Sequence, residues 1–144
     1  MKRIYIAVIV ACSLGWATCG CAVTPSAPVV SAVNLSSSVE NAFKDRKSNV
    51  QVEGAGKVIR LLPDDLEGSR HQRFIIRLAS GQTLLIVHNI DMAPRVVGLK
   101  KDDSVRFYGE YVWNEKGGMV HWTHHDPKGH HAAGWVKHNG RTYQ

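Results

Sequence analysis

The chain has 144 residues, a formal net charge of +6 and 44% hydrophobic residues, a composition typical of one small globular domain. The basic excess, 18 basic against 12 acidic residues, permits contact with a phosphate or an anionic surface but requires neither. All three cysteines (Cys12, Cys19 and Cys21) lie near the N-terminus, which excludes disulfides and thiolate chemistry from the rest of the chain.

The first 22 residues have the anatomy of a bacterial export signal. A basic Met1-Lys2-Arg3 start precedes an apolar stretch from Ile4 to Ala11, and small residues follow as far as Ala22. The apolar stretch is shorter than the ~20 residues that a membrane span needs, so a transmembrane anchor is the weaker alternative. Cleavage after residue 22 removes two basic residues and lowers the formal charge from +6 to +4. We expect an exported protein, either periplasmic or attached to a membrane of the cell envelope.

The cysteines of this segment raise the question of lipid attachment. Gly20 before Cys21 fits a lipoprotein signal of normal length. The residues before Cys12 fit the lipoprotein pattern better but leave a very short apolar core. Ordinary cleavage after Ala22 is the competing outcome, so membrane attachment through a lipidated cysteine and release to the periplasm both stay open.

A tether and a short helix are predicted next. Residues 23–38 are rich in Ser, Pro, Ala and Val, which is typical of a flexible linker. Val39, Ala42 and Phe43 then recur at helical spacing, and Ser36 to Ser38 offer N-caps. We expect residues 39–144 to form a single domain, with this helix closing one end of it.

From Val50 onward the hydrophobic period is two residues, which predicts β-strands. The predicted strands cover residues 50–58, 73–78, 83–88, 104–113 and 119–123, and a loop or one helical turn interrupts them at residues 90–98. Glycines in the first strand permit the bend that a closed barrel needs. Five strands with this spacing predict an all-β fold: a small oligonucleotide/oligosaccharide-binding (OB)-like barrel preceded by a short N-terminal helix and followed by an irregular His-rich C-terminal tail. Val105, Phe107 and Tyr111 are expected to point inwards.

Several phrases carry resemblances to known families. Residues 99–110 resemble the entry to the fourth strand of many OB-folds, where an acidic turn precedes a Val-x-Phe-x-Gly strand. The phrases that begin at Gly68, at His88 and at His121 (His-Trp-Thr-His-His-Asp-Pro) resemble an exported bacterial family classed as a domain of unknown function. That resemblance covers roughly residues 50–144 and implies an OB-like barrel but no activity. A likeness of residues 89–94 to exported staphylococcal-type nucleases is superficial, because Leu62-Pro63-Asp64-Asp65 stands where their Asp-Gly-Asp-Thr phrase is expected.

Six of the eight histidines lie between His121 and His138, and imidazole is the side chain best suited to metal ligation and proton transfer near neutral pH. If the fifth strand continues into the tail, His121, Thr123 and His125 lie on one face of it, and Trp122, His124 and Asp126 lie on the other. Imidazoles and a carboxylate are standard ligands of zinc or manganese. The predicted ligands are His121, His124, His125, Asp126 and His130, with His131 as a further candidate, and we expect at least two of these histidines to converge with Asp126. A bound metal that activates water would make His124 and His125 catalytic. The alternative is a structural lid of histidines and aromatic side chains.

A second predicted site lies at the entry to the second strand. Arg70, His71 and Arg73 could together hold a phosphate or a carboxylate, unless the arginines only line a solvated face. Lys57, Arg60 and Arg106 could extend this surface. Tyr108 and Tyr111 are the predicted stacking surfaces for bases or sugars.

Two functions follow from these residues. The first is an exported OB-fold protein that binds a nucleic acid or another polyanion at the cell envelope, with or without a divalent metal in the tail. The alternative is a metal-dependent periplasmic nuclease or phosphodiesterase that uses the tail. Salt-sensitive binding that is indifferent to a chelator favours the first function, and turnover lost with a chelator and in His125→Ala favours the second.

Overall fold

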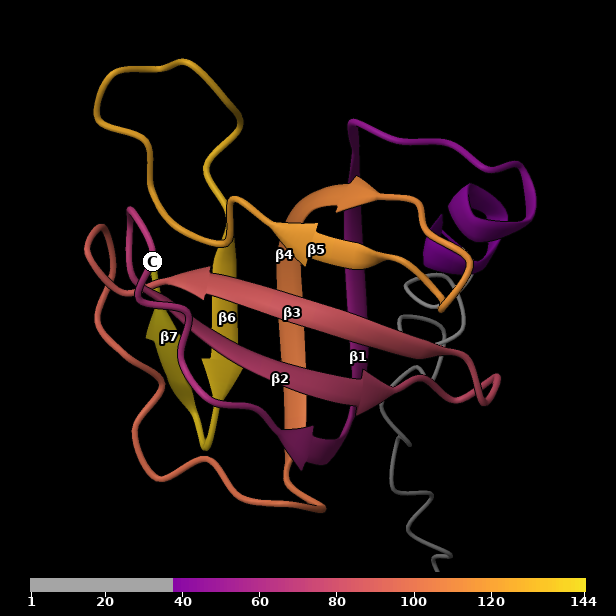
Figure 1. The fold of residues 1–144 in the computed structure, drawn as a ribbon, viewed down its shortest axis with the longest axis horizontal. Helices are drawn as coiled ribbons and strands as arrows, with labels where there is room; N and C mark the ends of the chain where they lie inside the picture. The colour runs from indigo at the N-terminus through magenta and orange to yellow at the C-terminus, as the bar shows by residue number, and fades with distance from the viewer. Residues whose placement is uncertain (1–37) are drawn as a thin grey trace, which may run out of the picture.

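The computed structural model describes residues 38–144, and its strands form one barrel with a hairpin attached (Figure 1). A helix over residues 38–44 comes first. The strands are β1 (Val50–Leu61), β2 (His71–Arg77), β3 (Thr83–Asn89), β4 (Ser104–Val112), β5 (Met119–His121), β6 (Trp135–His138) and β7 (Arg141–Tyr143). The predicted export signal, its cysteines and all but the last residue of the predicted tether lie outside the described residues.

The barrel closes through five strands. β1 pairs with β2 and β2 with β3, both antiparallel, β3 pairs with β5 in parallel, β5 pairs with β4, and β4 returns to β1. β1 pairs with both β2 and β4. Its register with β2 shifts between Val58 and Arg60, and a bulge of this kind bends the strand so that it can pair with both. The predicted all-β class, with its small five-stranded OB-like barrel and short preceding helix, is confirmed.

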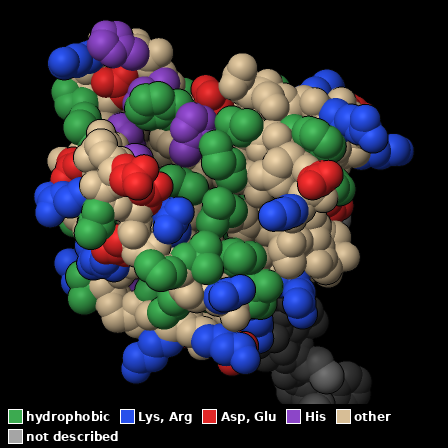
Figure 2. Space-filling model, viewed as in Figure 1, with side chains coloured by type: hydrophobic (Ala, Val, Ile, Leu, Met, Phe, Trp, Pro, Cys, Tyr) green, Lys and Arg blue, Asp and Glu red, His purple; other side chains and the backbone are tan. Residues whose placement is uncertain are grey.

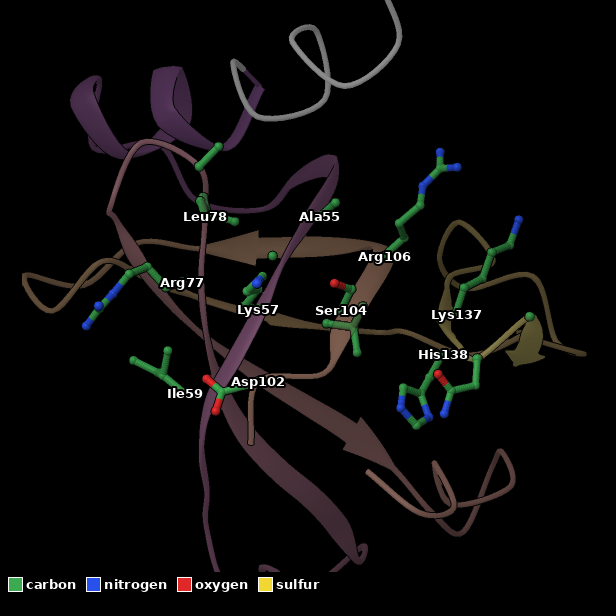
Figure 3. Close-up of a pocket in the computed structure, with 15 residues that line it drawn as sticks. Ala55, Lys57, Ile59, Arg77, Leu78, Asp102, Ser104, Arg106, Lys137 and His138 are labelled. Carbon is green, nitrogen blue, oxygen red and sulfur yellow. The ribbon is translucent and has the colours of Figure 1, made fainter. Parts of the chain in front are cut away.

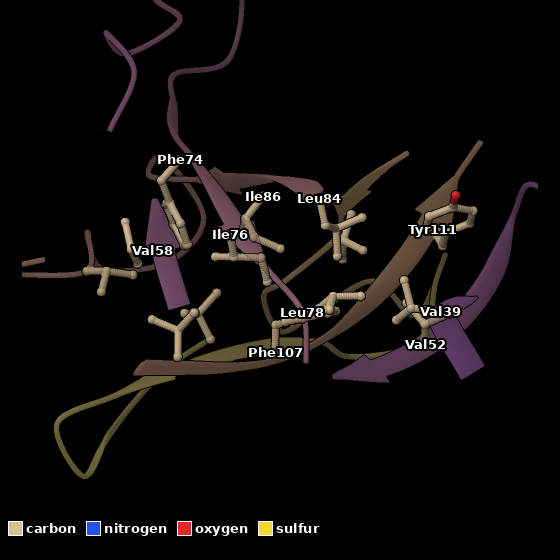
Figure 4. Packing of buried hydrophobic residues seen from close by; sticks show 14 of the residues in the cluster. Val39, Val52, Val58, Phe74, Ile76, Leu78, Leu84, Ile86, Phe107 and Tyr111 are labelled. Atoms are coloured by element: carbon tan, nitrogen blue, oxygen red, sulfur yellow. The ribbon is translucent and has the colours of Figure 1, made fainter. Parts of the chain in front are cut away.

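The core fills the barrel with the inward side chains of every strand (Figure 4). Val105, Phe107 and Tyr111 are 2%, 0% and 0% exposed, so the predicted inward face of β4 is confirmed. Gly54 is required at its position, because a Cβ atom there would lie 2.5 Å from Cζ of Phe107. Val39 of the helix is fully buried in the same cluster, which places the helix as the predicted plug.

The C-terminal tail has two parts. Residues 122–134 form a loop without strands, which begins two residues before the irregular tail predicted after residue 123. β6 and β7 then form a hairpin that the prediction lacked, and β6 pairs with the first half of β4. Asn139 and Gly140 turn the chain with φ values of 47° and 75°. This Asn-Gly pair between two alternating stretches is a strong hairpin signal, so the sequence contained the sign of this hairpin.

Candidate functional site

A concavity lies on the outer face of β1, β4 and β6, beside the end of β2 (Figure 3). Its volume is about 810 Å³, within the range of small-ligand sites. The register builds it: Ala55 of β1 lies opposite Arg106 of β4, and Arg106 lies opposite Lys137 of β6. Residues directly opposite in an antiparallel pair share a face, so these three side chains form one row across the sheet.

Basic and apolar residues both line this cavity. The basic residues among its lining are Lys57, Arg77, Arg106 and Lys137, and the acidic one is Asp102. Its lining also includes small and aliphatic residues, namely Ala55, Ile59, Leu78, Ala79 and Val105, of which Leu78 and Val105 belong to the buried core. Arg106 Nη2 also lies 2.8 Å from Glu53 Oε1, but both side chains are substantially exposed, and exposed ion pairs of this kind are worth little. The cavity is therefore suited to an anion that has an apolar part.

Two aromatic side chains continue the same face beyond the cavity. Tyr108 of β4 and Trp135 of β6 are register partners, and their rings stack with centroids 6.3 Å apart and an interplanar angle of 29°. Lys137 Nζ lies 4.3 Å from the centroid of the Trp135 ring. Both aromatic residues are partly exposed. Tyr108, a predicted stacking residue, thus lies next to the cationic row, together with Trp135, which was not predicted as a residue of this site.

His138 forms part of the cavity wall and is itself buried. Its Nε2 lies 2.8 Å from Asp103 Oδ2. The backbone N–H of Lys100 donates to the same carboxylate, and this bond, followed by the one from His138, lowers the pKa of Asp103. The carboxylate is therefore the acceptor, and His138 Nε2 carries a proton. Nδ1 of His138 is buried and has no hydrogen-bond partner among the described residues.

The predicted Arg70–His71–Arg73 site is occupied by bonds within the protein. Arg70 donates to Asp91 through its backbone N and its Nε, at 2.7 and 2.6 Å. Arg73 donates two hydrogen bonds to the Pro63 carbonyl. His71 lies at the start of β2, half-buried. Arg70 thus joins the entry of β2 to Asp91, and Arg73 joins β2 to the Pro63 carbonyl. Anion binding by Arg70, His71 and Arg73 stays a prediction.

Tyr111 was predicted to stack on a ligand, and the structure places it in the core instead. The side chain is fully buried, and its hydroxyl donates to the Gly117 carbonyl at 3.2 Å. Burial raises its pKa. Tyr111 therefore presents no surface to a ligand, because its alternation along β4 points it inwards.

The fifth strand ends earlier than predicted, at His121, because Trp122 has a φ of 51°. The expected alternation of faces ends with it. Thr123 and His124 are both buried, whereas His125 is exposed. A positive φ in a residue other than glycine changes the direction of the chain, so it turns the histidine-rich loop away from the strand.

Trp122 is the centre of an imidazole cluster. Its ring centroid lies 5.3 Å from that of His121, 5.7 Å from that of His124 and 4.1 Å from that of His131. Figure 2 shows histidines gathered at the end of the molecule from which residues 122–134 project. This arrangement matches the alternative in which histidines and aromatic side chains pack as a lid.

The other members of the predicted metal set have separate positions. His121 Nε2 lies 3.3 Å from Glu110 Oε1, and burial lowers the pKa of His121. His125 and His130 are exposed. Asp126 accepts bonds from the backbone N–H groups of Lys128, His130 and His131. Although desolvation raises the pKa of Asp126, these donors outweigh it and bring the pKa to about 2.

Among residues 38–144, no group of three or more His, Cys, Asp or Glu side chains is arranged to hold a metal ion. The predicted zinc or manganese site and the catalytic roles of His124 and His125 therefore stay predictions.

His88 belongs to the same end of the barrel and was missed as a site residue. Its Nε2 donates to the Pro94 carbonyl at 3.1 Å, and its Nδ1 lies 2.9 Å from the Thr123 hydroxyl. Burial lowers its pKa. The signal was present in the sequence, because His88 follows Leu84 and Ile86 at alternate, inward positions of β3. A polar side chain at such a position needs partners inside the protein.

Comparison with known proteins gives a family but no activity. The sequence profile of the family described as "Protein of unknown function (DUF3465)" matches residues 23–144. None of the curated proteins compared with the chain matches it. Within residues 38–144, no helix is both long enough and apolar enough for a membrane span.

Proposed function

The chain belongs to the DUF3465 family of proteins of unknown function, and we propose that it is a cell-envelope binding module for a polyanion. The proposed ligand class is single-stranded nucleic acid, bound on the outer face of β1, β4 and β6. The observation that carries this proposal is the set of four basic side chains around one cavity, with a single acidic residue in its lining. The export signal expected at residues 1–22 supports the location at the envelope.

The register of β4 and β6 supports an anionic ligand. Arg106 and Lys137 are direct cross-strand partners, and like charges in such positions destabilise a sheet. An anion bound between them relieves this repulsion. The arginines of the second-strand entry are less suited to the role, because Arg70 and Arg73 already have bonds within the protein.

The neighbouring aromatic pair favours nucleic acid among polyanions. Tyr108 and Trp135 stack two residues along the strands from Arg106 and Lys137, on the same face of the sheet. Proteins that bind single strands combine a basic groove for the phosphates with aromatic side chains on which bases stack. A single-stranded nucleic acid bound across β4 and β6 would thus place its phosphates at Arg106 and Lys137 and its bases at Tyr108 and Trp135.

The test is fluorescence anisotropy of a labelled oligothymidylate with the purified protein over a range of NaCl concentrations, with and without a chelator. Four phosphate contacts predict a slope of log K against log [salt] of about −2.8 for a single strand. Lys57→Ala and Arg77→Ala should each weaken binding and reduce the slope by about 0.7. Binding should be indifferent to the chelator.

Lys44→Ala is the matched control, because Lys44 is exposed on the helix and is absent from the cavity lining. Equal losses in Lys44→Ala and Lys57→Ala would refute the assigned face and leave only an unspecific charge effect. Hydrolysis of the oligonucleotide that stops with chelator would instead support the nuclease alternative, with His124 and His125 as its residues.

A further inference from the structure

Two imidazoles in the loop of residues 122–134 are held in the same tautomer. His124 Nδ1 lies 2.8 Å from the His125 carbonyl, and His131 Nδ1 lies 2.8 Å from the Ala132 carbonyl. A carbonyl oxygen only accepts hydrogen bonds, so Nδ1 carries the proton in both rings and Nε2 carries the lone pair. A carbonyl on the far nitrogen is the arrangement that fixes the orientation and tautomer of metal-binding histidines.

The two rings also have a separation that suits a shared ion. Their centroids lie 5.1 Å apart at an interplanar angle of 90°. Two imidazoles that bind one tetrahedral ion through nitrogens at about 2 Å from it place their centroids about 5 Å apart. Asp126 Oδ2 lies 3.9 Å from His131 Nε2 and adds a negative charge beside the pair.

The surroundings hold this pair in place before any ligand binds. Trp122 packs against both rings. The His124 side chain is almost fully buried, and the His131 side chain is 9% exposed. The loop is closed at its base, where the Gly134 N–H donates to the His124 carbonyl at 2.9 Å. A pre-ordered pair loses little side-chain freedom on binding.

We propose that His124 and His131 bind a divalent transition metal of the copper and zinc class through their Nε2 atoms. Water completes the coordination, because among the described residues no third His, Cys, Asp or Glu is arranged as a ligand. Two protein ligands imply affinity in the micromolar range. This pair is a narrower choice from the histidines predicted from the sequence, since His125 and His130 are exposed and His121 Nε2 faces Glu110. The site shares no residue with the anion-binding cavity, so it does not depend on the proposed function.

The experiment is calorimetric titration of the chelator-treated protein with Cu²⁺ and with Zn²⁺, combined with tryptophan fluorescence. The expected result is one ion per chain, with Cu²⁺ bound more tightly than Zn²⁺. Cu²⁺ should quench part of the fluorescence, because Trp122 contacts both ligand rings. Trp122→Phe should keep the calorimetric signal and lose most of the quenching, since Trp113 and Trp135 lie outside the cluster.

His131→Ala should weaken binding at least tenfold, and His131→Gln should do the same with less disturbance of the packing. His125→Ala and His130→Ala are the matched controls, as exposed histidines of the same loop, and should bind with unchanged affinity. Equal losses in the controls would overturn the assignment and indicate unspecific binding by surface histidines. Absence of binding by both metals to the wild-type protein would overturn the site itself.

Discussion

His88 connects three parts of the chain at the histidine-rich end of the barrel, and its removal should be costly. The fully buried ring joins β3 to the Pro94 carbonyl and to the Thr123 hydroxyl. His88→Ala leaves both groups without this partner. A buried polar group without a partner costs about 1–3 kcal/mol, and the cavity left by the ring adds to this cost. We therefore expect His88→Ala to lower the free energy of unfolding by about 3 kcal/mol or more.

The same ring should make the stability fall on acidification. Burial lowers the folded-state pKa of His88 below its unfolded value of about 6.5. The unfolded chain therefore binds the proton more readily, and the stabilisation is complete above about pH 6.5 and is lost as the pH falls through the folded-state pKa. One such group contributes a slope of at most about 1.4 kcal/mol per pH unit. The pKa of His121 is lowered as well, so His121→Gln measures its separate share.

The assay is urea unfolding followed by circular dichroism at about pH 7.5 and about pH 5.5, in chelator, across the histidine range. His88→Gln should have a lower free energy of unfolding than the wild type at the higher pH. The change in its free energy of unfolding between the two pH values should be smaller than in the wild type, because it lacks the contribution of His88. The reasoning is refuted if His88→Gln retains the full wild-type pH dependence. A loss below about 1 kcal/mol in His88→Ala would equally show that the two hydrogen bonds contribute little.

Three further predictions concern packing and export. Gly54→Ala should destabilise the protein by about 1–3 kcal/mol, because its Cβ would lie 2.5 Å from Phe107 Cζ. In urea unfolding, the double variant with Phe107→Leu should lose less free energy of unfolding than the sum of the losses in the two single variants. Gly134→Ala should move the loop of residues 122–134, since its Cβ would lie 2.0 Å from the Trp122 carbonyl oxygen; unchanged Trp122 fluorescence would contradict this. Intact mass spectrometry of membrane and periplasmic fractions should find residues 1–22 removed, or Cys12 or Cys21 carrying a lipid, and an unprocessed chain in the cytoplasm would contradict the export signal.

Local patterns were sufficient to predict the barrel. The period-two alternation of β4 identified Val105, Phe107 and Tyr111 as core residues, and the structure buries all three. Alternation and turn signals act between neighbours in sequence, so they determine which segments become strands. The Asn139-Gly140 turn has the same local origin, which is why the C-terminal hairpin could also have been predicted.

The candidate sites depend on contacts between distant residues, and only the tertiary structure decides them. From the sequence, Arg70 and Arg73 were predicted to bind an anion. In the fold, Arg70 donates to Asp91 and Arg73 donates to the Pro63 carbonyl. Arg106 and Lys137 are 31 positions apart and become direct partners only through the register of β4 and β6.

The histidine-rich tail shows the same limit. Its composition indicated a cluster, but the choice of His124 and His131 follows from the turn of the backbone at Trp122, whose φ is 51°. That conformation is unfavourable for a tryptophan by itself and accompanies the ring contacts of Trp122 with His121, His124 and His131. Residue types were therefore readable from the sequence, whereas their orientation was decided by contacts that no local pattern contains.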